Sequence, residues 1–380
     1  MEDSKRIGIV GGGQLGRMMA LSAHKMGVQV AILDPGGIRS PAGQVVPSEL
    51  VVEGDLHNHR KIFNLSKMCD IITVETEHVN CDGLEYIVKN FNKTVYPYPD
   101  TIRLIQDKYK QKMFLKLHDI PIPEFGLVGS VEDILKWGEC YGYPIMLKSR
   151  KNSYDGYGNY VVRSCCSAEQ GYNKLGGSAN ELYVERWCPY KKELAVMIAK
   201  SISGDIVAYP VVETYHRNNI CMFVEYPVDV NDETLTRAME VAKGVVEKLG
   251  SPGIFGVEMF CMQDGGIFVN EVAPRPHNSG HYTIDACIVS QFEMHIRSIL
   301  GWPLVGNKPF VTSCIMNNVL GDTSIRDTIK PLEKAKMLDG VGIHWYGKGL
   351  KPGRKMGHIT VCGDTCVDVW DKVWYINDNS

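Results

Sequence analysis

A glycine-rich turn near the N-terminus is the feature that most constrains what this chain can fold into. An apolar run covers residues 7–10. It leads into Gly11, Gly13 and Gly16, which have the spacing G-x-G-x-x-G, and a helix-like stretch and a second apolar run ending at Asp34 follow. This order predicts a βαβ unit and fits the fingerprint of dinucleotide-binding domains. Taken alone, the turn is therefore compatible with the hypothesis that the chain is a nicotinamide-dependent enzyme.

Composition narrows the class of protein. With 380 residues, the chain is long enough for two or three domains. Its 41 basic and 44 acidic residues give a net charge of −3, which favours neither a nucleic-acid nor a membrane partner. Apolar runs are too short to span a bilayer, and a strand within the first ten residues leaves no room for a signal peptide. Because the twelve cysteines form no C-x-x-C pair, we expect reduced thiols and a cytoplasmic protein.

The pattern of strands and helices changes along the chain. Up to about residue 100, short β-branched runs alternate with helical stretches, which predicts a doubly wound parallel sheet. A single helix is expected over residues 101–118. The middle of the chain is mixed α+β, and the end is rich in strands and turns. We therefore expect three domains, at residues 1–104, 105–301 and 302–380.

Two glutamates mark a candidate metal site. Glu258 and Glu271 lie in two apolar strands joined by the turn "QDGG", so a hairpin would bring their carboxylates together. Such a pair repels unless a cation lies between its members, and carboxylates completed by phosphates suit Mg²⁺. The alternative is that both glutamates lie on the solvent face of an antiparallel ribbon.

A polar loop follows the second of these strands. "NEVAPRPHNSGH" places Arg275, His277 and Asn278 within a segment that two prolines keep out of regular structure. Arginine binds planar oxyanions, and histidine exchanges protons near neutral pH. Lys148 ends another apolar strand, just before a loop whose glycines would let backbone amides approach phosphates. Together these features favour an active site over a structural loop.

These segments also carry a family resemblance. "YPIMLKSR", "YVERW", "GVEMF" and "NEVAPRPHNSGHYT" resemble the ATP-grasp superfamily and, within it, the 5-(carboxyamino)imidazole ribonucleotide synthases. The chain is most similar to the synthase half of the bifunctional fungal-type phosphoribosylaminoimidazole carboxylases, and the match covers nearly all of it. The resemblance implies an ATP-grasp fold with a Rossmann-like N-terminal domain and a small β-rich C-terminal domain. It also implies carboxylation of aminoimidazole ribonucleotide with bicarbonate and ATP, through carboxyphosphate, in purine biosynthesis.

The resemblance assigns roles to individual positions. The ATP-binding residues would be Lys108, Lys148, Ser153, Tyr154, Asp155, Gly156, Tyr157, Gly158, Asn159, Glu185, Arg186, Trp187, Cys188, Glu193, His216, Asn270 and Glu271. The residues binding the ribonucleotide would be Gln14, Asp34, Glu75, Tyr154, Lys348, Arg354 and Lys355. Arg275, His277, Asn278 and Lys148 would serve the reaction, and Glu258 and Glu271 would bind magnesium.

By this resemblance the glycine turn does not bind NAD. Instead, the free amides at the start of the following helix would bind the anionic ribonucleotide. The family pattern has arginine where Tyr157 stands, and losing that charge predicts a flap that leaks carboxyphosphate. Because of Tyr157, a second hypothesis also stays open, in which the chain binds ATP without catalysing a reaction. The resemblance further implies a homodimer and a link to a carboxylase-mutase domain, of which this chain shows no part.

Overall fold

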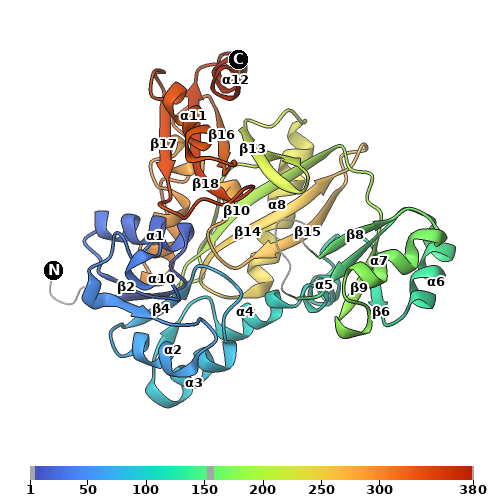
Figure 1. Cartoon of the computed structure of the whole chain (residues 1–380), viewed down its shortest axis with the longest axis horizontal. Coiled ribbons are helices and arrows are strands. Elements are labelled where there is room, and N and C mark those ends of the chain that lie inside the picture. The colour runs from blue at the N-terminus through green and yellow to red at the C-terminus, as the bar shows by residue number, and fades with distance from the viewer. Residues whose placement is uncertain (1–4, 152–157, 379–380) are drawn as a thin grey trace.

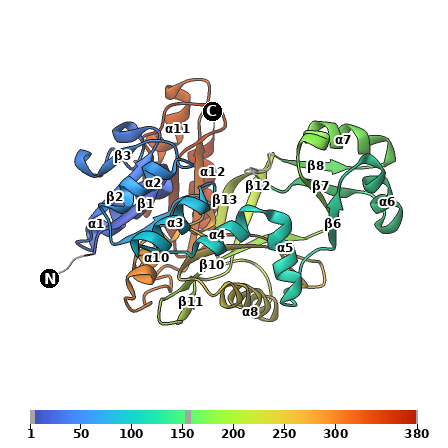
Figure 2. The ribbon, with the colours of Figure 1, turned by 90° about the horizontal axis from the view of Figure 1, so that it is seen from below.

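Three β-sheets organise the molecule. The computed structural model describes residues 5–151 and 158–378. Figure 1 shows the N-terminal sheet, a large central sheet and a small sheet. The view from below confirms that the small sheet and its helices stand at one end of the molecule (Figure 2). Residues of all three sheets line the cleft described below.

The N-terminal sheet is parallel, as the sequence predicts. Its strand order is β3-β2-β1-β4-β5. The strands are β1 (Ile7–Val10), β2 (Val30–Asp34), β3 (Val51–Glu53), β4 (Ile71–Val74) and β5 (Thr94–Val95). The helices α1 (Gln14–Lys25), α2 (His59–Ser66) and α3 (Cys81–Phe91) connect them. Since α1 packs in one apolar cluster and α2 with α3 in another, helices cover both faces of the sheet, and the Rossmann-like prediction is confirmed.

The single helix expected over residues 101–118 is wrong. The structure has α4 (Pro99–Gln106) and α5 (Lys108–Leu117), with Asp107 in an extended conformation between them. The Asp107 carboxylate accepts hydrogen bonds from the second and third amides beyond it and pairs with Arg150 at 2.5 Å. This side chain therefore ends one helix and caps the next. As a result Lys108 stands at the first position of α5.

The small sheet is antiparallel with the order β6-β9-β7-β8. Its strands are β6 (Phe125–Val128), β7 (Ile145–Ser149), β8 (Asn159–Val162) and β9 (Leu182–Arg186). The helices α6 (Val131–Tyr141) and α7 (Ala168–Lys174) pack on it through one apolar cluster. Lys148 of β7 and Glu185 of β9, on neighbouring antiparallel strands, both line the cleft described below.

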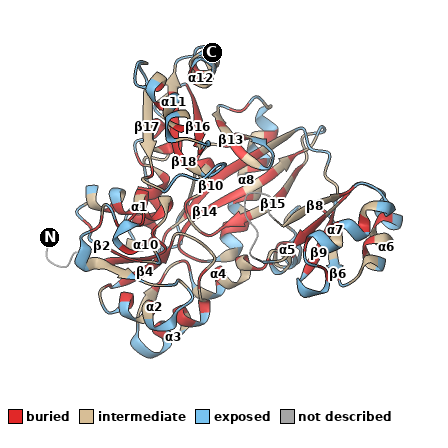
Figure 3. Ribbon diagram, viewed as in Figure 1, coloured by how far each residue is buried: buried red, intermediate tan, exposed pale blue. Residues whose placement is uncertain are grey.

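The large sheet is antiparallel and forms the centre of the molecule. Its order is β15-β14-β10-β12-β13-β16-β18-β17, and β11 also pairs with β10. The first strands in sequence are β10 (Lys192–Lys200), β11 (Ile206–Ala208), β12 (Val212–Arg217), β13 (Ile220–Tyr226), β14 (Gly253–Cys261) and β15 (Ile267–Ala273). Figure 3 shows β10 and β14 largely buried. The strand β10 is apolar on both faces because α8 (Asp232–Leu249) covers one and α10 (Gln291–Leu300) the other.

The C-terminal strands extend this large sheet. β16 (Ser313–Leu320) pairs with β13, and β18 (Lys355–Gly363) lies between β16 and β17 (Val341–Trp345). The helices α11 (Ile325–Ala335) and α12 (Cys366–Asn377) pack against these strands. The β-rich end thus contains two helices that the sequence pattern did not predict. The three domain boundaries stay predictions.

Helices that could cross a membrane are not found in the described part of the chain, where each helix is too short or too polar.

Candidate active site

One cleft of about 900 Å³ collects most of the predicted site residues. It lies where the N-terminal sheet, the small sheet and the large sheet meet. The predicted residues that line it are Gln14, Glu75, Lys108, Lys148, Asn159, Glu185, Arg186, Trp187, Cys188, Glu193, His216, Glu258, Asn270, Glu271, Arg275, His277, Asn278, Lys348, Arg354 and Lys355. Segments far apart in the sequence therefore build one polar site.

A buried carboxylate joins two lysines on the side of the small sheet. The Nζ atom of Lys148 lies 2.8 Å from Glu185 and 3.3 Å from the Oδ1 atom of Asn270. Lys112, which the sequence patterns missed, lies 3.2 Å from the same glutamate. Burial alone would raise the pKa of Glu185, but the two lysines hold it at about 2. The network keeps the Lys148 ammonium at a fixed place in the cleft.

The hairpin of β14 and β15 places Glu258 directly opposite Glu271, next to a β-bulge. Lys108 lies 2.6 Å from Glu271 and, against the effect of burial, lowers its pKa to about 2. The described residues place no lysine in an ion pair with Glu258, so burial and the charge of Glu271 raise its pKa to about 8. Both carboxylates reach the cleft, so neither lies on an open solvent face. A cation between them would remove the repulsion that raises the pKa of Glu258.

Several of the positions predicted to bind ATP lie together along the same wall of the cleft. Residues 185–188, at the end of β9, line the cleft. Glu193 accepts a hydrogen bond from the Tyr190 hydroxyl at 2.6 Å and lies 3.2 Å from the Nδ1 atom of His216. Tyr190 in turn stacks on Phe260 with ring centroids 4.6 Å apart. Glu193 and His216, 23 positions apart in sequence, meet because β10 pairs with β12.

Arg275 makes a different contact from the one its sequence suggested. Its Nε and Nη2 atoms lie 2.6 and 3.2 Å from the two carboxylate oxygens of Glu77. This fork holds the pKa of Glu77 at about 2 despite burial. The bidentate geometry expected for an oxyanion is therefore occupied by a carboxylate of the protein. Glu77 also lines the cleft, and the local sequence gave no signal for it.

Hydrogen bonds fix the protonation of His277. Its Nδ1 atom accepts from the backbone N–H of Ser279 at 3.4 Å and lies 2.9 Å from the Ser279 hydroxyl. With both of these groups donating to Nδ1, the proton of a neutral ring lies on Nε2. Burial and the charge of Arg275 lower the pKa of His277 to about 3, so the ring is neutral at neutral pH. The Nε2 atom lies 3.7 Å from Glu258. His277 thus presents a neutral N–H donor beside the paired carboxylates.

Hydrogen bonds from α10 and β16 hold the polar loop in place. Gln291 accepts from the backbone N–H of His277 at 2.9 Å and donates to its carbonyl at 2.7 Å. Asn278 exchanges two side-chain hydrogen bonds with Asn318, at 3.0 and 2.7 Å. Asn318 lies on β16, so the loop is fixed to the C-terminal strands. These bonds keep the loop in one conformation without any ligand.

The glycine turn differs most from expectation. Its amides were expected to bind the ribonucleotide, but carboxylates of the chain already occupy them. Gly13 and Gly16 donate to Glu75 at 2.6 and 2.7 Å, and Gly12 donates to Asp34 at 2.8 Å. A Cβ atom on Gly13 would lie 2.6 Å from the Glu75 carboxylate, so the glycine makes room for it. The site where a dinucleotide phosphate would bind is filled, which is physical ground against the nicotinamide hypothesis.

Asp34 is therefore a structural residue of the turn. Its second carboxylate oxygen accepts from the amide of Gly36 at 2.7 Å, and Asp34 is not among the described residues that line the cleft. Glu75 does line it. Burial raises the pKa of Glu75 even though the two amides of the turn lower it. Of the two acidic residues expected to bind the ribonucleotide, Glu75 lines the cleft and Asp34 does not among the described residues, and both assignments stay predictions.

Three cations close the opposite end of the cleft. The connection between β17 and β18 carries Lys348 and Arg354, and Lys355 is the first residue of β18. All three line the cleft. The Lys348 ammonium donates to the Lys355 carbonyl at 3.1 Å and lies over the Tyr346 ring. Arg354 donates to the Gly349 carbonyl at 3.2 Å. These groups give one end of the cleft a positive charge.

The phosphate flap falls mostly outside the described residues. Ser153, Tyr154, Asp155, Gly156 and Tyr157 belong to that part, so their predicted roles and the predicted leak stay predictions. Of the flap positions that the structure describes, Asn159 lines the cleft and Gly158 does not.

Comparison with models of protein families gives three matches that together cover most of the chain. They are "Ribonucleotide synthetase preATP-grasp domain" at residues 4–106, "ATP-grasp domain" at residues 113–292 and "Phosphoribosylaminoimidazole carboxylase C-terminal domain" at residues 314–372. With the sheets and the cleft described above, they define the class as ATP-grasp.

Relatives and solved structures narrow this class. The chain is 36% identical to the N5-carboxyaminoimidazole ribonucleotide synthase of Bacillus subtilis, over 93% of this chain and 90% of that protein. A crystal structure of carboxyaminoimidazole ribonucleotide synthase from Aspergillus clavatus, complexed with ATP, superposes with a TM-score of 0.93 at 37% identity, covering 99% and 98% of the two chains. The chain belongs to the N5-carboxyaminoimidazole ribonucleotide synthase family.

Fungal relatives are longer than this chain. It is 45% identical to the phosphoribosylaminoimidazole carboxylase of Candida albicans over 98% of its own length, but it spans only 66% of that protein. For the Candida glabrata protein of the same name, the spanned share is 64%.

Proposed function

We propose that this chain carboxylates 5-aminoimidazole ribonucleotide with bicarbonate and ATP, giving N5-carboxyaminoimidazole ribonucleotide, ADP and phosphate in purine biosynthesis. One observation carries the proposal. The polar loop with Arg275 and His277 lies in one cleft between the paired carboxylates and the three C-terminal cations. Family membership supports it, and an Aspergillus clavatus relative has been crystallised with ADP and 5-aminoimidazole ribonucleotide.

ATP would bind between the small sheet and the β14–β15 hairpin. Lys148 and Lys108 would neutralise its phosphates, and residues 185–188 would border the adenine. The residues present fit a magnesium ion, because the raised pKa of Glu258 marks a carboxylate pair short of positive charge. Glu258 and Glu271 would hold that ion. When bound, it would neutralise phosphate charge during transfer.

Bicarbonate would bind beside the polar loop. A bicarbonate oxygen attacks the γ-phosphorus of ATP, ADP leaves, and carboxyphosphate forms. The His277 Nε2–H can donate to this anion, while Arg275 adds a positive charge that its pairing with Glu77 holds in place. Carboxyphosphate then breaks down to phosphate and carbon dioxide, which the exocyclic amine attacks. Since the reaction consists of positioning and charge stabilisation, no residue has to act as a nucleophile.

The aminoimidazole ribonucleotide would span the gap to the C-terminal strands. Its phosphate would bind among Lys348, Arg354 and Lys355, the positive end of the cleft. Glu75 and Gln14, from the N-terminal sheet, would contact the other end of this substrate. The glycine turn would act indirectly by holding Glu75 in place.

Phosphate release from ATP tests the proposal. We expect release that requires bicarbonate and rises strongly when aminoimidazole ribonucleotide is added, with a carboxylated ribonucleotide as product. ATP binding without any release, under all these conditions, would favour a binding module instead.

A homodimer, a cytoplasmic location and a link to a carboxylase-mutase domain complete this proposal. The homodimer and the link rest on the family resemblance, and the cytoplasmic location rests on the cysteine pattern. Light scattering from the purified chain would test the first of them, with a mass near twice 42.4 kDa expected.

A further inference from the structure

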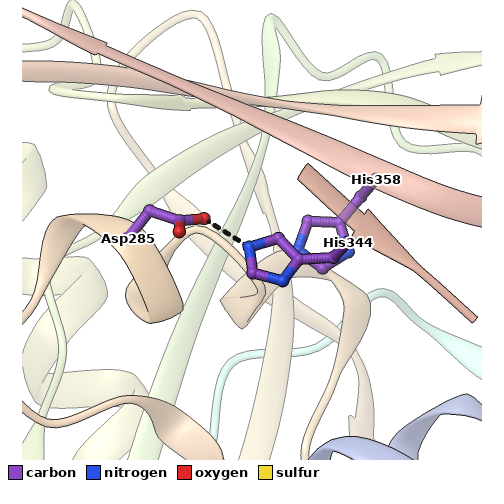
Figure 4. Close-up of side chains that lie close together, drawn as sticks. All are labelled: Asp285, His344 and His358. Carbon is purple, nitrogen blue, oxygen red and sulfur yellow. Dashed lines mark hydrogen bonds and ion pairs between the residues drawn. The ribbon is translucent and has the colours of Figure 1, made fainter. Parts of the chain in front are cut away.

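A second cluster of polar side chains lies outside the cleft. Asp285 of α9 (Thr283–Ala286), His344 of β17 and His358 of β18 come together there (Figure 4). One ligand atom from each residue lies within 4.8 Å of one from each other residue. None of the three lines the cleft among the described residues. We propose that they form a binding site for a divalent cation of the zinc class.

His358 supplies the observation that points to a ligand. The residue is fully buried, and its Nδ1 atom pairs with the Tyr346 hydroxyl at 2.7 Å. Its Nε2 atom has no hydrogen-bond partner among the described residues. A buried polar atom without a partner is costly, so such atoms normally meet water, an ion or a ligand. Burial also lowers the pKa of His358, so the ring is neutral, as metal binding requires.

The backbone places the two imidazoles side by side. His344 and His358 lie directly opposite each other on paired strands, and their rings stack with centroids 4.4 Å apart. The Nε2 atom of His344 pairs with Asp285 at 2.8 Å. Gly342 makes room for this carboxylate, because a Cβ atom there would lie 2.3 Å from it. Two neutral imidazoles and a carboxylate form a ligand set that zinc prefers.

Metal binding requires one movement. A ligand nitrogen points its lone pair along the ring plane, so two stacked rings do not face a common ion. His344 is the side chain free to turn, since it is 26% exposed whereas His358 is buried. On binding, the His344 proton moves to Nδ1, and the metal replaces the hydrogen bond between Nε2 and Asp285. No net proton has to leave the protein.

The position of the site gives the ion a role. His344 and His358 form the second-to-last residue pair before the β17–β18 connection, which carries Lys348 and Arg354. Asp285 lies just beyond the polar loop, on α9. A bound ion would tie the loop end of this hairpin to the segment that follows His277. It would thus hold two walls of the cleft together from outside.

Metal titration of the full chain tests this site. The protein is freed of metal with a chelator, kept in excess Mg²⁺ to occupy oxygen-rich sites, and titrated with Co²⁺ and Zn²⁺. We expect one equivalent of Co²⁺ with the visible absorption of a four- or five-coordinate nitrogen and oxygen site. Thiolate binding by the cysteines would instead give sulfur charge-transfer bands, and that result would overturn the proposal. Zn²⁺ should also raise the melting temperature.

Three variants identify the ligands. His344→Ala and Asp285→Asn should each weaken Zn²⁺ binding at least about 100-fold. Gly342→Ala keeps all three ligands, but its added Cβ atom would displace the Asp285 carboxylate, so this variant should also weaken Zn²⁺ binding. It provides a second test if either of the other two variants fails to fold. His59→Ala, at an exposed histidine of α2, should bind like the unmodified chain. Equal binding by His344→Ala and the unmodified chain, or no binding by the latter, would overturn the proposal.

Discussion

Two regions of this molecule each bring two carboxylates together, and they resolve the repulsion differently. In the glycine turn, Asp34 and Glu75 accept hydrogen bonds from amides at the start of α1. In the β14–β15 hairpin, Glu271 meets Lys108, while Glu258 keeps a raised pKa. In the first pair, backbone N–H groups donate to both carboxylates, although burial still raises the pKa of Glu75. The second pair is complete only with an added cation.

The difference between these two carboxylate pairs shows under which conditions a sequence motif indicates a ligand. A glycine turn before a helix binds anions only if its amides are free, and here residues of two other strands occupy them. A carboxylate pair in a hairpin indicates a cation only if the protein leaves one member without a positive partner. Both conditions depend on distant residues. The turn therefore predicts the fold, and the hairpin predicts the chemistry.

Removing one carboxylate of the hairpin should have the largest effect. Glu271→Gln should lower phosphate release from ATP at least about 1000-fold, because the site loses a ligand and the partner of Lys108. Its melting temperature should stay close to that of the unmodified chain. Glu247→Gln, at an exposed glutamate of α8, is the matched control and should keep full activity. Phosphate release at the unmodified rate from Glu271→Gln would refute the metal assignment.

Changing Glu75, which holds the glycine turn and lines the cleft, should affect stability in addition to substrate binding. Glu75→Gln places an amide N–H₂ against one of two backbone donors, which should cost about 1–3 kcal/mol and lower the melting temperature. Thermal unfolding beside the Glu247→Gln control measures this cost. Neither protein should bind NADH in a fluorescence titration. Saturable NADH binding, or an unchanged melting temperature, would contradict the account of the turn.

Magnesium binding at the β14–β15 hairpin should depend on pH, which would distinguish this carboxylate pair further from the pair at the glycine turn. Since Glu258 holds its proton up to about pH 8, Mg²⁺ has to displace that proton at neutral pH. Its affinity should rise between about pH 6 and pH 8 and then level off, and calorimetry should detect proton release.

The same shift affects stability with the opposite sign. The unfolded chain loses this proton near 4.5, so without metal the contribution of Glu258 falls as pH rises from 4.5 toward 8. Glu258→Gln should remove both effects. A variant that keeps the full pH dependence would assign it to another group.

The smallest effect is expected at the far end of the cleft. Arg354→Ala should raise the Michaelis constant for aminoimidazole ribonucleotide about tenfold, the value of one charge-assisted hydrogen bond. The constant for ATP should stay the same. Steady-state kinetics with each substrate varied in turn measures both. A change confined to ATP would place Arg354 in the nucleotide half.

Local patterns predicted much of the fold. The alternation of β-branched runs and helical stretches gave the parallel sheet, and the turn after β14 gave the Glu258–Glu271 pairing. The helix break at Asp107 was missed because a capping carboxylate competes with a strong helical pattern, and Arg150, 43 positions away, holds it in place.

Partners of the site residues could not be predicted in this way. Glu77 and Arg275 are 198 positions apart, and Lys112 and Glu185 are 73 apart. Nothing in the neighbourhood of either residue indicates such a pair, because three sheets have to assemble before they meet. The residues proposed to take part in the reaction could be predicted, because their residue types and spacing form a motif. The residues that hold them became visible only in three dimensions.

Transfer of labelled carbon tests the central claim most directly. The unmodified chain is incubated with ATP, Mg²⁺, aminoimidazole ribonucleotide and isotopically labelled bicarbonate, and the ribonucleotide is recovered and counted, with Glu271→Gln as the blank. We predict label in the ribonucleotide only when ATP is present, and none above background with Glu271→Gln. Consumption of ATP without labelled ribonucleotide, or label transferred equally by Glu271→Gln, would contradict the account.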